Sequence, residues 1–247
     1  MHYDPGHPWT VNPAEAIAIQ QRLRSRVRLG SGPRGVRVLA GVDAGFEDQG
    51  RTVRAALALM RYPDLTILNT HLARRPTPFP YVPGLLSFRE LPAVLAVLEA
   101  VAEPPDLVLC DGQGIAHPRR LGIASHLGVI TGLPTIGVGK SRLTGQFQPP
   151  GEIRGDWSPL MDGDERIGTV LRTRSGVKPL FISPGHRVSH EEAVHWVLAC
   201  TPRYRLPEPI RAADRLASNR QTKRARSGKT GSQTECRAVG SVQKGKP

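Results

Sequence analysis

The chain has 247 residues, of which 39% are hydrophobic and 22% are charged, and its formal net charge is +13. A chain of this length can bury the core of one large domain or two small ones. Its longest uncharged apolar stretch, residues 127–139, contains Pro134 and is shorter than the roughly 20 residues that a membrane-spanning helix needs. The composition therefore argues against a transmembrane protein and a membrane partner.

The three cysteines are scattered along the chain, at Cys110, Cys200 and Cys236. No CxxC or Cys/His pair has the spacing of a zinc site, and an odd number of thiols argues against a disulfide framework. The opening residues show no basic segment followed by an apolar run, so no secretory signal is expected. These features predict a protein of the reducing cytoplasm.

Residues 220–247 form a basic tail that differs in composition from the rest of the chain. They include eight basic residues and one acidic residue, a net charge of +7, and almost no large apolar side chains. Such a segment cannot bury a core and is expected to be disordered. Basic arms commonly bind nucleic acids, and a solvated tail without a binding role is the alternative. The folded domain is therefore expected over residues 1–219.

Hydrophobic periodicity predicts an alternation of strands and helices along this domain. Strands are expected at residues 36–42, 55–61, 65–72, 107–110, 135–139, 167–172 and 179–183. Helices are expected at residues 13–28, between the loop at 79–84 and about residue 101, and at 119–129, 189–200 and 209–217. The first three strands predict an antiparallel meander, and the later strands alternate with helices. This order predicts a single α/β domain with a mixed sheet flanked by helices.

Asp43 and Asp111 are each the first charged residue after an apolar run that predicts a buried strand. A carboxylate at such a strand end loses its hydration at a cost of several kcal/mol unless a cation pairs with it. No Lys or Arg adjoins either residue in the sequence, and a shared divalent ion, Mg²⁺ or Mn²⁺, would neutralise both. For Asp111 alone, an ordinary Asp-Gly turn after a strand is the alternative.

Glu90 is a third candidate carboxylate. It lies at the margin of the apolar face of the helix that ends near residue 101, where its side chain would point along the core edge toward the sheet. Alternatively, Ser87 and Glu90 form a capping box at the start of that helix. The local sequence is compatible with both interpretations, because Pro92 obscures where the helix begins.

Tyr81 stands between Pro80 and Pro83, and the two prolines fix the backbone on either side of its ring. A rigid exposed aromatic ring suits stacking on bases or wedging between them. The alternative is a ring that packs on the next helix.

Three glycines in residues 111–122 let the backbone approach a flat ligand closely. His117, Arg119 and Arg120 add groups in the same stretch that commonly bind phosphate. This pattern alone is a weak indication of nucleic-acid binding.

Taken together, these segments resemble the endonuclease V family of repair nucleases. The matching stretches occur in the family's order and cover about residues 13–218. They are GVDAGF (41–46), PYVPGLLSFRE (80–90), DGQGIAHPRRLGIASH (111–126), TIGVGK (135–140), GVKPLFISPGHR (176–187) and YRLPEP (204–209). Long consecutive matches are far more specific than a three-residue pattern. The tail after Asn219 is not part of the resemblance.

The resemblance implies an RNase H-like fold with a carboxylate cluster that binds Mg²⁺, for which Mn²⁺ can substitute. Asp214 falls where the family has a more variable polar residue near the metals. The acids at the family's metal-binding positions are Asp43, Glu90 and Asp111, and the polar residues at positions near the scissile phosphate are His117 and Lys140. One departure is Ser141, where the family more often has a second lysine, so one phosphate contact is in doubt.

The resemblance also implies a pocket for a base that has been flipped out of the nucleic acid. Tyr81 matches the wedge that fills the gap left by the extruded base. The residues that match the pocket for the flipped hypoxanthine are Gly84, Leu86, Gly112, Gly122 and Ile123.

The function that follows is that of a hydrolase acting in DNA repair. Such an enzyme recognises deoxyinosine in DNA and cleaves the second phosphodiester bond 3′ to the lesion, leaving 3′-hydroxyl and 5′-phosphate ends. The partner is then DNA that contains deoxyinosine, and a monomer is expected. One alternative is an inosine-specific endoribonuclease of the same fold. Another is a non-catalytic inosine-binding module, against which the presence of all three acids argues.

Overall fold

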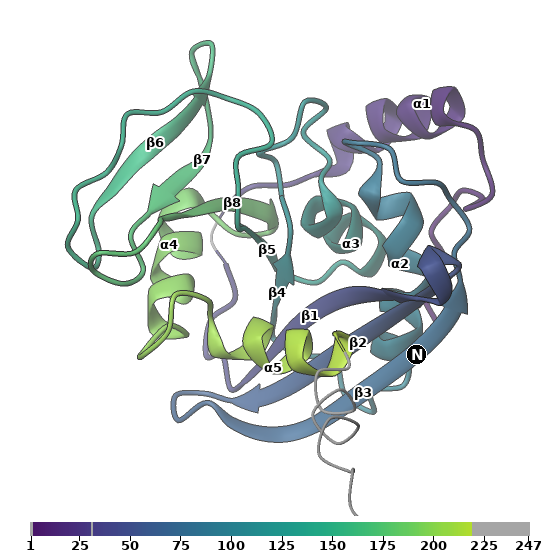
Figure 1. The fold of residues 1–247 in the computed structure, drawn as a ribbon, viewed down its shortest axis with the longest axis horizontal. Helices are drawn as coiled ribbons and strands as arrows, with labels where there is room; N and C mark the ends of the chain where they lie inside the picture. Colours follow the sequence, from purple (N-terminus) through teal and green to yellow (C-terminus); the bar gives the residue numbers. More distant parts are fainter. Residues whose placement is uncertain (1, 31, 219–247) are drawn as a thin grey trace, which may run out of the picture.

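The computed structural model describes residues 2–30 and 32–218, so the predicted tail lies outside the described residues. Its central feature is one eight-stranded sheet with the order β3-β2-β1-β4-β5-β8-β7-β6 (Figure 1). The strands are β1 (Val38–Glu47), β2 (Thr52–Arg61), β3 (Thr66–Pro76), β4 (Leu107–Asp111), β5 (Thr135–Gly139), β6 (Trp157–Asp162), β7 (Glu165–Leu171) and β8 (Leu180–His186). The helices are α1 (Pro13–Leu23), α2 (Leu86–Glu99), α3 (Ile123–Thr131), α4 (His190–Ala199) and α5 (Glu208–Ala217), with short 3₁₀ turns η1 (Arg24–Arg26) and η2 (Asp48–Gly50).

The sheet is mixed, as the sequence predicts. Strands β1, β2 and β3 form the antiparallel meander, β4 and β5 run parallel to β1, and β8, β7 and β6 extend the sheet in antiparallel order. Helices α1, α2 and α3 lie on one side of it, and α4 and α5 lie on the other (Figure 1). Among the described residues, no helix combines the length and hydropathy that crossing a membrane requires. The predicted α/β class is confirmed.

Several elements differ from the sequence prediction; for example, helix α1 ends at Leu23 rather than at residue 28, and strand β3 runs to Pro76 rather than to residue 72. Strand β1 does not end at Asp43 but continues to Glu47, because it pairs with β2 along its whole length and Glu47 faces Thr52. Helix α3 begins at Ile123 rather than near residue 119, because the glycine-rich segment before it is a loop. Strand β6 is not predicted from the sequence, because it contains Pro159 and its buried residues alternate with exposed ones, so it has no continuous apolar run.

Two kinds of side chain alternate along β2 and explain how the helices pack. Val53, Ala55 and Leu57 face the side covered by α2, where they join its apolar residues in one buried cluster. Ala56 and Ala58, on the opposite face, pack against α5. Because these residues are small, α5 can lie close to the sheet.

The same alternation in β1 brings α5 against the strand that carries Asp43. Gly41 and Gly45 lie on the α5 face: a Cβ on Gly41 would stand 2.1 Å from the Pro209 backbone, and one on Gly45 would stand 2.5 Å from the Ala217 carbonyl oxygen. Asp43 lies between them in the strand and faces the same side. The two glycines therefore allow α5 to cross directly over the position of Asp43.

The contact between α5 and Gly41 predicts a large effect of one methyl group. Gly41→Ala is expected to lower the free energy of unfolding by about 1–3 kcal/mol, because the added Cβ must displace the Pro209 backbone. Gly30→Ala is the matched control, since a Cβ there meets no atom within 4 Å. That control should leave stability unchanged or raise it slightly. Urea denaturation of both variants is the measurement, and equal stabilities would contradict the close packing of α5.

Candidate active site

Three aspartates from distant parts of the chain come together at one end of the sheet. Asp43 lies in β1, Asp111 is the last residue of β4, and Asp214 lies in α5. Each offers a carboxylate oxygen, and these oxygens all lie within 4.8 Å of one another. The parallel register, in which Val42 faces Cys110, sets Asp43 beside Asp111. Helix α5 brings Asp214 in from above the strands.

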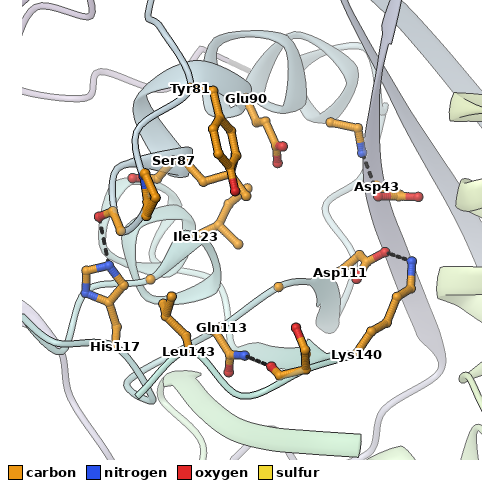
Figure 2. A pocket seen from close by; sticks show the side chains of 18 of the residues that line it. Asp43, Tyr81, Ser87, Glu90, Asp111, Gln113, His117, Ile123, Lys140 and Leu143 are labelled. Atoms are coloured by element: carbon orange, nitrogen blue, oxygen red, sulfur yellow. Dashed lines mark hydrogen bonds and ion pairs between the residues drawn. The ribbon is translucent and has the colours of Figure 1, made fainter.

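Lys140, which directly follows β5, is the positive charge at this cluster. Its ammonium group forms an ion pair and hydrogen bond with Asp111 (Figure 2). Its Nζ also lies 3.9 Å from the Asp214 carboxylate. Arg205 holds the backbone there, because its guanidinium donates to the Lys140 carbonyl oxygen at 3.0 Å. Burial alone would lower the pKa of Lys140, but the neighbouring carboxylates, Asp111 first, outweigh burial and raise it.

The aspartates are not neutralised by that one lysine. Burial, and after it the negative charge of Asp111, raise the pKa of Asp43 to about 8, although Lys140 opposes the shift. The raised pKa means that the charged form of Asp43 is unfavourable in the metal-free protein. A nearby positive ion would stabilise that charged form. The cluster can therefore hold a metal ion, and its ligands are oxygens, which hard divalent cations prefer.

Glu90 approaches the same place from α2, on the other side of the sheet. Its side chain is 6% exposed and borders a small cavity together with Asp43 and Asp111, but it is not part of the three-aspartate cluster. Figure 2 shows its carboxyl group set apart from theirs. Burial, followed by the charges of Asp43 and Asp111, raises the pKa of Glu90 well above its ordinary value. The alternative of a capping box with Ser87 is wrong, since α2 begins without any side-chain cap.

A cavity of about 490 Å³ opens beside the cluster and is lined by the residues that the resemblance assigns to the site, but not by Arg119 or Arg120. On one side it is lined by the aspartates, Glu90 and Lys140. On the other it is lined by the residues assigned to the wedge and the base pocket, namely Tyr81, Gly84, Leu86, Gly112, Gly122 and Ile123. Figure 2 shows Tyr81 and Ile123 on the opposite side of the opening from Asp43 and Lys140. The carboxylate cluster and the loop residues assigned to the base pocket thus share one cavity.

The loop that carries Tyr81 is held at Gly84. This glycine has φ +77°, a backbone conformation that favours residues without a Cβ. Its carbonyl oxygen accepts hydrogen bonds from Gln20 Nε2 at 3.0 Å, His117 Nε2 at 2.8 Å and Arg119 Nη2 at 2.8 Å. The Tyr81 ring itself is 70% exposed, so the alternative in which it packs on the next helix is wrong.

His117 and the two arginines after it are engaged within the protein. Burial lowers the pKa of His117 to about 4, so its ring is neutral at pH 7 and fixes Gly84. Arg120 pairs with Asp162 and Glu165 at the ends of β6 and β7. The expectation that Arg120 seeks phosphate is therefore wrong, because its charge ties the β6–β7 hairpin to the glycine-rich loop.

Sequence reasoning missed two residues of this site. Gln20 in α1 is 1% exposed, lines the cavity and bonds the carbonyl oxygens of Gly84 and Leu121. A polar residue inside the apolar stripe of the predicted helix is the signal that could have found it. Gln113 lines the cavity as well, and its side-chain amide donates to the Ser141 carbonyl oxygen at 2.9 Å. Nothing in the local sequence indicates that contact.

Comparison with known proteins agrees with this geometry. The family model for endonuclease V matches residues 21–215. Endonuclease V of Alkalilimnicola ehrlichii is 61% identical over 217 residues, which are 87% of this chain and 95% of that protein. Endonuclease V of Trichormus variabilis is 56% identical over 219 residues, which are 88% of this chain and 99% of that protein.

Solved structures give the same result. The crystal structure of endonuclease V from Streptomyces avermitilis superposes with a TM-score of 0.82 at 46% identity, covering 88% of this chain and 96% of that one. Endonuclease V from Ciona intestinalis, in complex with a DNA that contains an inosine followed by a ribo-adenosine, superposes with a TM-score of 0.73 at 26% identity, covering 85% of this chain and 98% of that one. The fold, the length and the sequence all agree: the chain belongs to the endonuclease V family.

Proposed function

We propose that this chain is a DNA repair endonuclease that recognises deoxyinosine and hydrolyses the second phosphodiester bond 3′ to it, leaving 3′-hydroxyl and 5′-phosphate ends. The observation that carries the proposal is the shared cavity, in which the carboxylate cluster adjoins the loop residues that the resemblance assigns to the base pocket. The complex of the Ciona intestinalis relative with a DNA that contains an inosine followed by a ribo-adenosine supports inosine as the recognised nucleoside. The buried free thiols Cys110 and Cys200 agree with a cytoplasmic location, and we propose that the enzyme acts as a monomer.

Mg²⁺, with Mn²⁺ as a substitute, is the metal that we propose for the cluster. The donor set fits, since it is made of closely spaced carboxylate oxygens with an incompletely neutralised charge. Asp43, Asp111 and Asp214 would hold the ion, and Glu90 would join from α2. Bound there, it would supply Lewis-acid activation of water and of the scissile phosphate.

The protein's own residues would orient the substrate. Lys140 places a positive charge at the rim of the cluster, where it can meet a phosphate oxygen. Tyr81 is exposed at the mouth of the cavity, where its ring can occupy the space left by the flipped base. Gly84, Gly112 and Gly122 have no side chain to obstruct a base that enters between the loops. His117 would act by holding the Gly84 carbonyl, and through it the Tyr81 loop.

Removing either strand carboxylate is expected to abolish the reaction. Asp43→Ala and Asp111→Ala should each reduce Mg²⁺-dependent nicking of a deoxyinosine-containing duplex by roughly 100-fold or more, because the metal loses a ligand at the charge that develops during cleavage. Binding of the same DNA in Ca²⁺ should be largely retained. Asp164→Ala, in the exposed turn between β6 and β7, is the matched control and should nick normally.

The assay also tests the substrate. A single-stranded DNA and an RNA of equal sequence, each with one inosine, separate the proposed deoxyribonuclease from an inosine-specific ribonuclease. Binding without any nicking in Mg²⁺ or Mn²⁺ would mean that the chain is a binding module, and nicking by either alanine variant within a few-fold of wild type would rule out the metal-ligand assignment.

The raised pKa of Asp43 predicts how the metal-free protein responds to pH. The folded state holds this proton up to about pH 8, whereas an unfolded aspartate releases it near pH 4, so wild-type stability falls as the pH rises between these values. Asp43→Asn removes that loss and should be more stable than wild type at pH 8 by at least about 1.4 kcal/mol, the equivalent of one pKa unit. At pH 4 the difference should vanish. Thermal melting with EDTA is the measurement, and a variant that is less stable at pH 8 would contradict the prediction.

Tyr81 should matter more in a duplex than in a single strand. Flipping a base out of a duplex costs a few kcal/mol of unstacking, and an inserted ring offsets part of that cost. Tyr81→Ala should therefore reduce the cleavage rate on duplex deoxyinosine more than on the single strand, whereas Tyr81→Phe should resemble wild type because it keeps the ring. Comparing the two rates with the melting temperature is the test. Equal losses on both substrates together with a lowered melting temperature would make Tyr81 a structural residue.

A further inference from the structure

A series of hydrogen bonds runs from the N-terminal segment to a serine in the wall of the cavity. The imidazoles of His7 and His126 meet through their Nε2 atoms at 2.9 Å, and His126 Nδ1 lies 3.0 Å from Ser87 Oγ. At the outer end, His7 Nδ1 lies 2.9 Å from the Pro8 carbonyl oxygen. Ser87 lines the cavity (Figure 2) and is 2% exposed, and His126 is fully buried. The polar groups of His7, His126 and Ser87 therefore hydrogen-bond mainly with one another.

The hydrogen bond between His7 and the Pro8 carbonyl determines which atom donates in each of the other hydrogen bonds of the series. A carbonyl oxygen only accepts, so His7 Nδ1 must carry a hydrogen and donate it to Pro8. Burial lowers the pKa of both histidines, so His7 is neutral and its Nε2 is an acceptor. His126 must then donate from Nε2, which leaves its Nδ1 without a hydrogen. The Ser87 hydroxyl is consequently the donor to His126.

Packing keeps the two imidazoles in place. The His7 ring lies 4.6 Å from Trp9 in an edge-on contact and 5.5 Å from Phe88. The His126 ring lies 5.6 Å from Trp9 and 5.3 Å from Phe88. An aromatic cluster thus holds the histidines in the orientation that their hydrogen bonds require.

With its hydrogen committed to His126, Ser87 Oγ has only lone pairs left for a ligand. Hypoxanthine carries a hydrogen on N1, whereas N1 of adenine carries a lone pair. We propose that Ser87 is a specificity-determining residue that accepts a hydrogen bond from N1–H of the flipped base, and that His126 and His7 are positioning residues that keep its oxygen an acceptor. The inference rests on the proposed function, because it requires the base to enter this cavity. It separates hypoxanthine from adenine but not from guanine, which also carries N1–H.

Single-stranded substrates test the proposal without the cost of breaking a base pair. One oligonucleotide carries deoxyinosine and a second carries deoxynebularine, whose unsubstituted purine has a lone pair at N1. Ser87→Ala is expected to reduce single-turnover cleavage of the inosine strand about tenfold and to leave the nebularine strand unchanged, so the preference falls about tenfold. A purely structural role would lower both rates in proportion, and an unchanged preference overturns the proposal. Absence of inosine cleavage by the wild type would instead contradict the proposed function itself.

The positioning role has a matched pair of variants in the N-terminal segment. His7→Ala removes the outer end of the hydrogen-bond series and should lower the preference about threefold, since His126 can then adopt either tautomer. His2→Ala removes a contact of 2.9 Å between His2 Nδ1 and the Glu99 carboxylate, in the same segment but outside the series of hydrogen bonds. It should keep the wild-type preference. Equal effects of the two variants would mean that anchoring of the segment, not the tautomer, is responsible.

The wild-type protein offers a direct measurement that does not depend on any variant. Side-chain ¹⁵N chemical shifts distinguish which imidazole nitrogen carries the hydrogen. We expect His7 to be protonated on Nδ1 and His126 on Nε2. A hydrogen on Nδ1 of His126 would make Ser87 its acceptor and would overturn the proposal.

Discussion

Mutual repulsion among the carboxylates at the end of the sheet is the constraint on which the site depends. Three aspartate oxygens within 4.8 Å, with Glu90 buried beside them, form a charge that one lysine does not balance. Burial, followed by this repulsion, raises the pKa of Asp43 and of Glu90, so protonation relieves the charge in the metal-free protein. A bound divalent cation would relieve the repulsion without protonating the carboxylates. The fold keeps the carboxylates close although their repulsion costs free energy when no cation is bound.

Three features of the sheet impose this closeness. The antiparallel pairing of β1 with β2 keeps Asp43 within a strand rather than on a loose end. The parallel pairing with β4 sets Asp111 beside it. Gly41 and Gly45 remove the side chains that would hold α5, and with it Asp214, away from the strands. Gly41 and Gly45 are therefore as important for the position of Asp214 as the charged residues of the cluster are.

Much of this site could be predicted from the sequence, because some of its signals are local. Asp111 follows a fully apolar strand, and the two prolines beside Tyr81 predicted a rigid exposed ring. The helix pattern supplied Glu90 as a candidate and the motifs of the resemblance supplied Lys140, but no local pattern reveals that they lie near Asp111. The structure brings these residues into one cavity.

What the sequence could not show depends on contacts between distant segments. Arg120 forms ion pairs with Asp162 and Glu165 of the β6–β7 hairpin. The glycine-rich sequence around Arg120 does not indicate these distant partners. Gln20 reaches Gly84 across 64 positions of the chain. The continuation of β1 past Asp43 follows from its pairing with β2, since a charged residue after an apolar run ordinarily predicts the end of a strand.

The central claim is that carboxylates from β1, β4 and α5 form one cation site. Binding of Mn²⁺ followed by electron paramagnetic resonance tests it directly, with wild type beside Asp43→Asn, Asp111→Asn and Asp214→Asn, and with the exposed Asp164→Asn as control. Each cluster variant should bind Mn²⁺ roughly tenfold or more weakly, while the control binds as wild type does. If Asp214→Asn bound Mn²⁺ as tightly as wild type, helix α5 would contribute no ligand and this account of the site would be contradicted.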